Sequence, residues 1–473
     1  MRKLRNTGEY LKYAASRTET NPDWDSVGVR SDSQGWYMIT IGYGTQDGKY
    51  KLKQFDFDGK LVVDSNFITI DEIPSPTKTF YKSLFGKELP DIRSDRTAPP
   101  VVAPTTPSPS PTPTPTPTPD PDFGPITSSY NSTSGYGEVD LRRAINEITG
   151  ENLVEVDDSE GDIYEYLPGP AIRDDTVTRS GALEAHAAGY RGQEIIVAVI
   201  DTGVNIDHVD INDNIWVNEG EIAGDGIDND GNGYVDDING WNTANDNNNV
   251  SDIQGHGTHV AGIIAAEDNG IGRIGVAPDV KIMVLNSFKN NFGTISAAQE
   301  DTNEAIYYAV DNGAHVINLS LGSDSGSVLP ERVAALKYAE DNGVICVYAS
   351  GNSNLSRPGS PGIAARDIGV VVGAVNDDGS RASFSNRAGG EGDILGDGNA
   401  KPLYVTANGV SVLSLDSNDD NGYRNLQGTS MACPVVAGAV AVMLSANPNL
   451  DPDDIKVILA NTSYDSVGQQ RGF

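Results

Sequence analysis

GTSMACPVVAGAVAVMLSA, residues 428–446, is a long apolar run that follows a glycine-led turn. No face of this run is polar when it is wound as a helix, so we expect a helix that is buried on all sides. Pro434 falls early in the run, where a missing backbone N–H costs little. Ser430 then stands at or beside the helix N-terminus, where amide groups and the helix dipole stabilise negative charge. The serine is therefore either a helix cap or an activated nucleophile.

Upstream of this helix, short apolar segments alternate with helical ones. Continuous apolar strands favour a parallel sheet that is buried on both faces. Helical segments lie between several of them, as at 295–313 and 330–343, and each of these two ends in glycine. The pattern predicts an α/β fold with a doubly wound parallel sheet, in which sites lie at the carboxyl ends of the strands. The expected strands are EIIVAVID (194–201), VKIMVL (280–285), HVINLSLG (315–322), GVICVYASGN (343–352) and IGVVVGAV (368–375).

Four polar residues stand where such a site is expected. Asp201 and Asn352 follow strands, and His256 and Ser430 begin helices, so their side chains have reason to converge at one end of the sheet. Acyl transfer by a Ser-His-Asp triad needs this set. His256 would take the hydroxyl proton of Ser430 and later give it to the leaving amine, while Asp201 would orient the imidazole. Asn352 and the backbone N–H of Ser430 would donate to the oxyanion.

His256 is the best candidate base among the five histidines of the chain. Two glycines flank it and would let a substrate approach. The other four fit surface, turn, packing and strand-start positions; they are His186, His208, His259 and His315. A Gly-x-Ser-x-Gly elbow is absent around Ser430, which argues against an α/β-hydrolase.

Several motifs together resemble the subtilases, the subtilisin-like serine endopeptidases. The resemblance covers about residues 180–462 and rests on VAVIDTG (197–203), GHGTHVAG (255–262), NLSLG (318–322), ASGN (349–352) and GTSMACPVVAG (428–438). It implies a seven-stranded parallel sheet, the triad Asp201, His256 and Ser430, and Asn352 as the oxyanion residue. It also implies that an extended substrate pairs with the backbone around 320–322 and 292–295. The substrate-binding residues expected on this basis are Ser320, Leu321, Gly322 and Gly293.

The chain departs from the subtilase pattern in the place of one helix. Many subtilases close the domain with a GYG-led helix after the serine helix, whereas here the GYG-led helix at 135–149 precedes the catalytic motifs. We expect it to fill the closing position from the N-terminal side, as in a circular permutation. The alternative is a pro-segment or a linker helix. A Gly/Asp-rich stretch at 388–402 is a further departure and is expected to be an inserted loop.

The stretch DGIDNDGNGYVDD, from Asp225, fits a calcium-binding loop. Counted from Asp228 it has the pattern D-x-[DN]-x-[DN]-G, which places oxygen ligands on alternate residues of a tight turn. Asn239 replaces the glutamate expected at the twelfth position, so the loop is not a complete EF-hand. Structural calcium is the expected cofactor, and an acidic solvated turn is the alternative. The candidate metal ligands are Asp225, Asp228, Asp230, Asn232, Tyr234, Asp236 and Asp237.

Composition divides the chain into four parts. Residues 1–95 alternate aromatic and β-branched residues with polar ones and predict a small β-rich accessory domain. Residues 96–124 are a Pro/Thr-rich linker, expected to be an extended spacer. Residues 125–180 form a lead-in segment with the GYG-led helix, and 181–473 form the subtilisin-like peptidase domain. The first part has no recognisable chemistry, and it is either an accessory module or an inhibitory pro-domain.

The charge balance limits the partners of the chain. Its 33 basic and 67 acidic residues give a net charge of −34, which argues against nucleic acid and anionic membrane. The expected partners are a protein or peptide substrate and the chain's own N-terminal region as a regulator. We expect no membrane-spanning helix and no classical signal peptide, hence a cytoplasmic or non-classically exported protein. Cys346 and Cys433 lie in apolar contexts and are expected as buried free thiols.

The leading hypothesis is a calcium-stabilised serine endopeptidase. One alternative is a dedicated enzyme that processes or transpeptidates a single precursor peptide. A second alternative, from another functional class, is a non-catalytic, calcium-dependent binding protein with the same fold.

Overall fold

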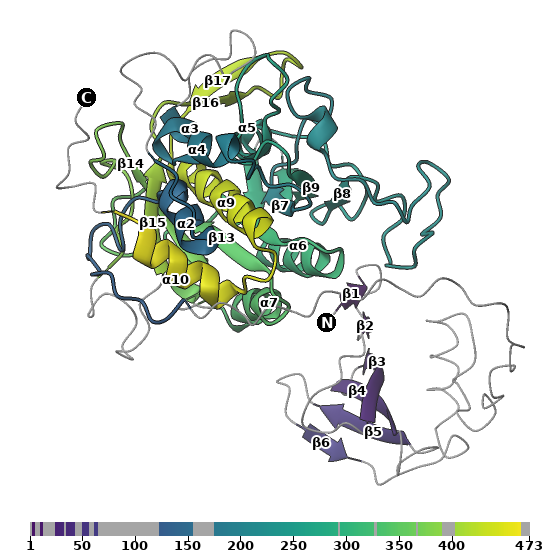
Figure 1. The fold of residues 1–473 in the computed structure, drawn as a ribbon. Helices are drawn as coiled ribbons and strands as arrows, with labels where there is room; N and C mark the ends of the chain where they lie inside the picture. The colour runs from purple at the N-terminus through teal and green to yellow at the C-terminus, as the bar shows by residue number, and fades with distance from the viewer. Residues whose placement is uncertain are drawn as a thin grey trace, which may run out of the picture. The chain divides into compact units, whose positions relative to one another are not determined.

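The structure is a computed structural model that divides into two compact units, Met1–Thr116 and Pro117–Phe473. It describes residues 123–154, 175–291, 294–325, 329–365, 368–389 and 403–464, together with the backbone of six strands between residues 2 and 64. Each unit is described by itself (Figure 1). Residues 390–402 of the predicted inserted loop at 388–402, and nearly all of the predicted linker, lie outside the described residues.

The N-terminal unit contains a six-stranded antiparallel sheet in which each strand pairs with the next along the chain. The backbone of these strands lies within residues 1–95, where a β-rich part was expected. The limits of this unit at residue 95 and its role stay predictions. The strands are β1 (Arg2–Leu4), β2 (Tyr10–Lys12), β3 (Trp24–Asp32), β4 (Gly35–Gly42), β5 (Tyr50–Phe55) and β6 (Leu61–Asp64).

The second unit is built on a seven-stranded sheet with the order β15-β14-β13-β12-β7-β9-β8, and all of its pairings are parallel. The five strands expected from apolar runs are all present. β15 and the three-residue β8, which were not among them, lie at the two edges. The strands are β7 (Ile196–Asp201), β8 (Gly240–Asn242), β9 (Lys281–Asn286), β12 (Val316–Leu319), β13 (Ile345–Ala349), β14 (Val370–Val375) and β15 (Leu403–Asn408).

Helices cover both faces of this sheet, as a doubly wound fold requires (Figure 1). Successive residues of a strand point to opposite faces, so Val197 and Val199 enter one core while Ala198 and Ile200 enter the other. The first core contains residues of α2 (Leu141–Thr149), α4 (Ala182–Ala187), α5 (His256–Ala265), α9 (Thr429–Ala446) and α10 (Pro452–Thr462). The second contains residues of α6 (Gln299–Asp311) and α7 (Pro330–Asp341).

Smaller elements fill the connections between these helices and strands. They are α3 (Asp175–Arg179), α8 (Gly362–Ala365), the 3-10 turn η5 (Asn212–Asn214), the hairpin of β10 (Phe288–Asn291) and β11 (Thr294–Ala297), and the hairpin of β16 (Val412–Leu415) and β17 (Tyr423–Leu426). The turn between β16 and β17 contains DSNDDNG (416–422).

The direction of chain travel reverses at β7. From β7 the chain first builds β8 and β9 on one side and then β12 to β15 on the other. A crevice for ligands is expected where the carboxyl ends of the strands meet such a switch point. Asp201 ends β7, and Ser320 follows β12 on the neighbouring strand. The topology therefore brings sequence-distant polar residues to one place.

The serine helix α9 is the central helix of the domain, as the opening run of sequence predicted. By length and composition alone it could cross a membrane, which corrects the expectation that no run was long and apolar enough. However, 83% of the 18-residue stretch Thr429–Ala446 is buried inside the domain, as in the core helix of a globular protein. Both cysteines are buried and free, which confirms that prediction.

The GYG-led helix α2 packs against α9 and α10, as the closing-segment hypothesis requires (Figure 1). The backbone before it extends the sheet: Tyr136 N–H donates to Tyr404 O (2.8 Å), and Thr406 N–H donates to Gly137 O (2.7 Å). On its other side, Glu138 forms a reciprocal backbone pair with Tyr464. A segment from before the catalytic motifs thus lies between the edge strand and the end of the last helix.

Ile145 offers a direct test of whether α2 belongs to the domain core. The side chain is 0% exposed within the first core, so Ile145→Ala should lower the free energy of unfolding by about 3 kcal/mol through lost burial and a residual cavity. Denaturant unfolding of the catalytic unit measures this. Glu147→Ala, on the exposed face of the same helix, should change it by less than about 0.5 kcal/mol. An unchanged stability in Ile145→Ala would favour a detachable linker helix.

Candidate active site

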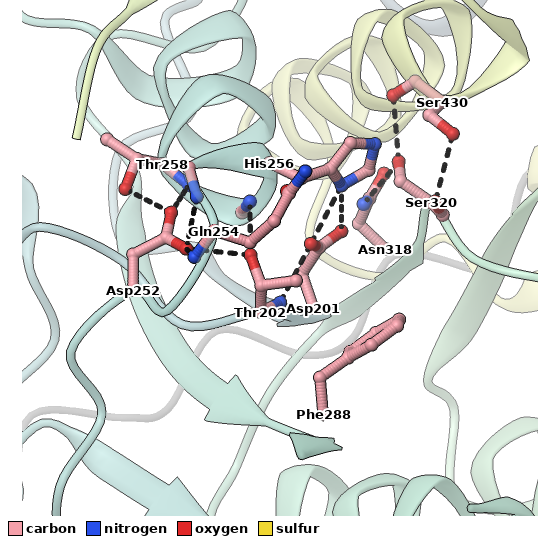
Figure 2. A network of polar contacts seen from close by, with 12 residues as sticks. Asp201, Thr202, Asp252, Gln254, His256, Thr258, Phe288, Asn318, Ser320 and Ser430 are labelled. Atoms are coloured by element: carbon pink, nitrogen blue, oxygen red, sulfur yellow. Dashed lines mark hydrogen bonds and ion pairs between the residues drawn. The ribbon is translucent and has the colours of Figure 1, made fainter. Parts of the chain in front are cut away.

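Asp201 and His256 form a close polar pair at the carboxyl end of β7. His256 Nδ1–H donates to the Asp201 carboxylate, with Nδ1 2.8 Å from Oδ1 and 3.0 Å from Oδ2 (Figure 2). The Asp201 side chain is 1% exposed, whereas the His256 ring keeps 26% of its surface exposed. Because the carboxylate holds Nδ1, the free Nε2 of the ring is available as a base.

The glycines on either side of His256 have structural roles, and the substrate access expected from the sequence stays a prediction. Gly255 caps α5 with φ +95°, and a Cβ there would lie 2.7 Å from an Arg424 guanidinium nitrogen. A Cβ on Gly257 would lie 2.1 Å from the Gly203 carbonyl oxygen, so only glycine lets α5 approach the end of β7. Both glycines therefore fix His256 against Asp201.

Two opposing effects set the pKa of His256. Burial of the ring lowers the pKa, but the charge of Asp201 and its hydrogen bond outweigh burial, so the pKa of His256 is raised above its ordinary value. A base must be neutral to accept a proton, so activity that depends on this ring should fall as the pH drops through the pKa of His256, which lies above the ordinary histidine value of about 6.5.

Ser430 is the second residue of α9, and it faces the carbonyl group of Ser320. Its hydroxyl donates to the Ser320 carbonyl oxygen (3.0 Å), and the Ser320 hydroxyl donates to the Ser430 carbonyl oxygen (2.9 Å; Figure 2). A hydroxyl has one proton, so Ser430 must leave this carbonyl before it can donate to His256. The structure thus joins Asp201 to His256 and Ser430 to Ser320 as two separate pairs.

Asn352, which follows β13, is fixed by the residue that precedes the serine. Its Oδ1 accepts from the Thr429 N–H (2.8 Å) and the Thr429 hydroxyl (3.0 Å), so its Nδ2 is directed elsewhere. A Cβ on Gly428 would lie 3.3 Å from Asn352 Nδ2 and 3.6 Å from the Ser430 nitrogen. The missing side chain at Gly428 therefore leaves open the space beside both nitrogen donors, where an oxyanion could be bound.

The second histidine of the GHGTH motif has a structural part. His259 is fully buried, and its Nε2 lies 3.1 Å from Val412 O and 3.0 Å from Arg424 O, so Nε2 carries the proton. Burial lowers the pKa of His259 to about 3. A neutral ring that ties α5 to the β16–β17 hairpin agrees with the packing role expected for it.

Three of the four residues predicted to bind substrate follow β12, on one side of the switch point. Ser320 is buried beside Ser430, Leu321 is half-buried, and Gly322 is exposed beyond β12. Gly293 lies outside the described residues, between β10 and β11. Phe288 of β10 is also near the site in Figure 2.

The acidic loop brings together two of the seven predicted metal ligands, Asp228 and Asp230, with a third carboxylate from Glu221. Ligand oxygens of these three residues all lie within 4.8 Å of one another. Sequence reasoning missed Glu221, because it lies upstream of the twelve-residue loop pattern. Its carboxylate accepts from the N–H groups of Asn229 (2.6 Å) and Asp236 (2.9 Å), which folds the loop around it.

The side chains of the other five predicted ligands make the following contacts in this structure, and the ligand expected from Tyr234 was its backbone carbonyl oxygen. Asp236 accepts from three backbone N–H groups, of residues 224–226, and Asp225 accepts from Ile227 and Asn229. Asp237 is fully buried and accepts from the Tyr308 hydroxyl. Asn232 donates to Asp230 and Asp237, and the Tyr234 ring packs edge-on against Trp241 and Tyr308. The predicted loop is therefore anchored to α6 through Asp237.

Asp252, Arg424 and Thr429 contact the candidate site but were not predicted. Asp252 stands three residues before Gly255, a spacing typical of a side chain that accepts from the start of a helix, and this signal could have found it. Arg424 lies on the β16–β17 hairpin, far in sequence from the residues that it contacts. Thr429 directly precedes Ser430 and belongs to the same sequence motif. Nothing in their local sequence points to these contacts.

Comparison with known proteins agrees with this geometry. A profile of the subtilase family matches residues 192–473, a range that contains the four predicted catalytic residues. Subtilisin DY of Bacillus licheniformis is 37% identical over 285 residues, which cover 59% of this chain and 87% of that protein. Subtilisin BL of Lederbergia lenta is 35% identical over 288 residues, 61% of this chain and 90% of that protein. Alkaline elastase YaB of Bacillus sp. (strain YaB) is 34% identical over 290 residues, 61% of this chain and 64% of that protein.

Proposed function

This chain belongs to the subtilase family and is a serine endopeptidase, and we propose that it cleaves peptide bonds through Asp201, His256 and Ser430, with Asn352 as an oxyanion donor. The observation that supports the proposal most directly is the 2.8 Å contact between His256 Nδ1 and Asp201 at the switch point of the sheet. Protein or peptide is the substrate.

The proposed reaction proceeds through an acyl-enzyme. Ser430 Oγ forms a bond to the peptide carbonyl carbon while His256 Nε2 takes the hydroxyl proton. The oxygen of the tetrahedral intermediate carries the negative charge, which Asn352 Nδ2 and the Ser430 N–H stabilise. The C–N bond then breaks as His256 gives its proton to the leaving amine, and water releases the acyl group by the same steps in reverse. Asp201 stabilises the charged ring throughout.

Fluorophosphonate labelling tests this proposal at the serine itself. The reagent phosphonylates only an activated serine, so labelling of the wild type followed by peptide mapping should identify Ser430. The Ser430→Ala variant should take up no label. Labelling that persists at another residue in this variant would refute the assignment, and an unlabelled wild type that stays folded would favour a non-catalytic protein.

Replacing Asn352 with alanine should lower kcat by roughly 10²–10³-fold, the range known for the loss of one oxyanion donor in a subtilisin. KM should change little, because the lost hydrogen bond forms in the transition state and not in the ground state. Steady-state kinetics on a peptide substrate measures both. Ser353→Ala, at the neighbouring exposed position, is the matched control and should keep kcat within a few-fold. An equal loss in both variants would remove Asn352 from the oxyanion site.

Calcium is the cation that we propose for the acidic loop. Three carboxylates with oxygens within 4.8 Å of one another repel, and a hard divalent cation relieves that repulsion while accepting their oxygens. Glu221, Asp228 and Asp230 would hold the ion, and the remaining predicted oxygen ligands, from Asp225, Asn232, Tyr234, Asp236 and Asp237, would complete the shell after rearrangement. The ion would stabilise the loop and would supply no chemistry to peptide cleavage.

Chelation should therefore lower thermal stability. At a free calcium concentration a hundred times its dissociation constant, binding stabilises the folded state by about 2.7 kcal/mol, so a chelator should lower Tm by several degrees. Asp228→Asn should lower Tm in calcium but remove most of the response to chelator. Asp246→Asn, an exposed carboxylate outside the loop pattern, should respond as the wild type does. Identical calcium responses in all three proteins would place the ion elsewhere.

A further inference from the structure

We infer that Asp252 and Arg424 are a pair of positioning residues that hold the start of α5 from two sides and set the charge around His256. The inference rests on the proposed function, in which His256 is the base. Both residues contact Gly255, the residue before His256, but through opposite groups of its backbone.

The Asp252 carboxylate joins the end of β7 to the start of α5. Its Oδ1 accepts from the Thr202 hydroxyl (2.8 Å), next to Asp201, and from the Gly255 N–H (2.7 Å), next to His256. Its Oδ2 accepts from the Thr258 N–H (2.9 Å) and hydroxyl (2.6 Å) in the first turn of α5 (Figure 2). With the Gln254 N–H (2.9 Å), one carboxylate accepts five hydrogen bonds.

Thr202 extends this connection to the catalytic pair itself. Its backbone N–H donates to Asp201 Oδ1 (2.8 Å), and its hydroxyl oxygen accepts from the Gly257 N–H (3.0 Å). The same threonine therefore orients the carboxylate of Asp201, holds the residue after His256 and donates to Asp252. Loss of the Asp252 carboxylate would therefore weaken the connection between the strand that carries Asp201 and the helix that carries His256.

Arg424 holds Gly255 from the side of the β16–β17 hairpin. Its Nη2 donates to the Gly255 carbonyl oxygen (2.8 Å), while Asp252 accepts from the N–H of the same residue. Gly255 has no side chain and a φ of +95°, which lets the guanidinium approach this closely. The peptide units that lead into His256 thus have a negative group on one side and a positive group on the other.

The two charges act on the ring in opposite directions. The charged groups that face His256 are Asp201 on β7, Asp252 in the loop before α5, and Arg424 on β17. Burial lowers the pKa of His256, Asp201 raises it most, Asp252 raises it further, and Arg424 lowers it. If Asp252 and Arg424 were only structural, replacing either would lower activity without moving the pH dependence. If their charges act on the pKa of His256, replacing them should move the pH dependence of activity in opposite directions.

The test is the pH dependence of kcat/KM for the full-length chain on a peptide without ionisable side chains. In Asp252→Asn the acid limb should move down by about half a pH unit, and the plateau should fall roughly 10- to 100-fold as the pair loses its geometry. In Arg424→Gln the acid limb should move up by a similar amount, whereas Arg424→Lys should restore its wild-type position because the charge is kept. Asp252→Glu should likewise keep the acid limb while losing part of the plateau.

Asp207→Asn is the matched control, since it removes an exposed carboxylate from the loop after β7 and should leave the profile unchanged. The inference would be overturned if the acid limb of the kcat/KM profile moved in the same direction in Asp252→Asn and Arg424→Gln. It would also be overturned if the acid limb stayed in place in both variants while Tm fell. If Asp252→Asn does not fold, the comparison of Arg424→Gln with Arg424→Lys decides alone. Cleavage that survives in Ser430→Ala would instead overturn the proposed function, so the two failures are distinguishable.

Discussion

Replacing Ser430 with alanine is expected to lower kcat by about 10⁶-fold, the scale known for loss of the nucleophile in a subtilisin. The hydroxyl oxygen is the atom that forms the acyl bond, and the other groups of the site then have no covalent step to assist. The fold should be unaffected, because the lost hydroxyl donates only to the Ser320 carbonyl oxygen. Cleavage of a peptide substrate and thermal unfolding, measured on the same preparation, separate these two effects.

Ser445→Ala is the matched control for this experiment. It makes the same chemical change near the other end of α9, where the hydroxyl donates to Val442 O and accepts from the Gly192 N–H. It should cost a little stability and leave kcat unchanged. Residual activity of Ser430→Ala above about one part in a thousand of the wild type, with no contaminating protease, would contradict the nucleophile assignment.

Asp201→Asn is expected to lower kcat by about 10⁴-fold with the fold intact. The Thr202 N–H donates to Oδ1 of Asp201, so the amide oxygen of an asparagine would stay at that position. The amide NH₂ would then replace Oδ2 and face His256 Nδ1, 3.0 Å away. That NH₂ group repels a protonated Nδ1, although the amide oxygen stays 2.8 Å from Nδ1 and can still accept from it. The tautomer with the proton on Nε2, which cannot accept one from Ser430, is therefore favoured, and a neutral amide no longer stabilises the charged ring.

Kinetics over a range of pH measures this loss, and histidine NMR reports the tautomer directly. The wild type should show the proton on Nδ1, and Asp201→Asn should show it on Nε2. A loss of less than about a hundredfold, or an unchanged tautomer, would mean that the Asp201 carboxylate does not orient the base.

The sheet was largely predictable because its strands are buried on both faces. Val197 to Ile200 face two cores, so every residue of such a strand must be apolar, and the run is visible without any periodicity. β8 escaped prediction because it is a three-residue strand at the edge of the sheet, beside β9, and the sequence around it has the composition of a polar loop. α2 was predicted as a helix, but its packing against α9 and α10 depends on contacts between segments about 300 residues apart.

The acidic loop shows where a local pattern stops being informative. Alternate Asp and Asn residues identified the turn, because a tight turn presents side chains of alternate residues to one point. The structure groups Asp228 and Asp230 with Glu221, whereas Asp237, which Asn232 bridges to Asp230, also accepts from Tyr308 on α6 in the interior. Glu221 completes the cluster from outside the pattern, so its part depended on how the preceding segment folds back.

Residue type and order alone determined the fold class, five of the seven strands of the sheet and the identity of the four proposed catalytic residues. Buried strands require apolar runs, and acyl transfer requires an acid, a base, a nucleophile and an oxyanion donor. Both requirements can be recognised from the types and order of the residues. Only the tertiary structure decided that Asp252 and Arg424 contact Gly255 from opposite sides, and that Thr429 directs the amide of Asn352. These contacts join segments that are distant along the chain, and their hydrogen-bond geometry depends on how helix, hairpin and strand pack together.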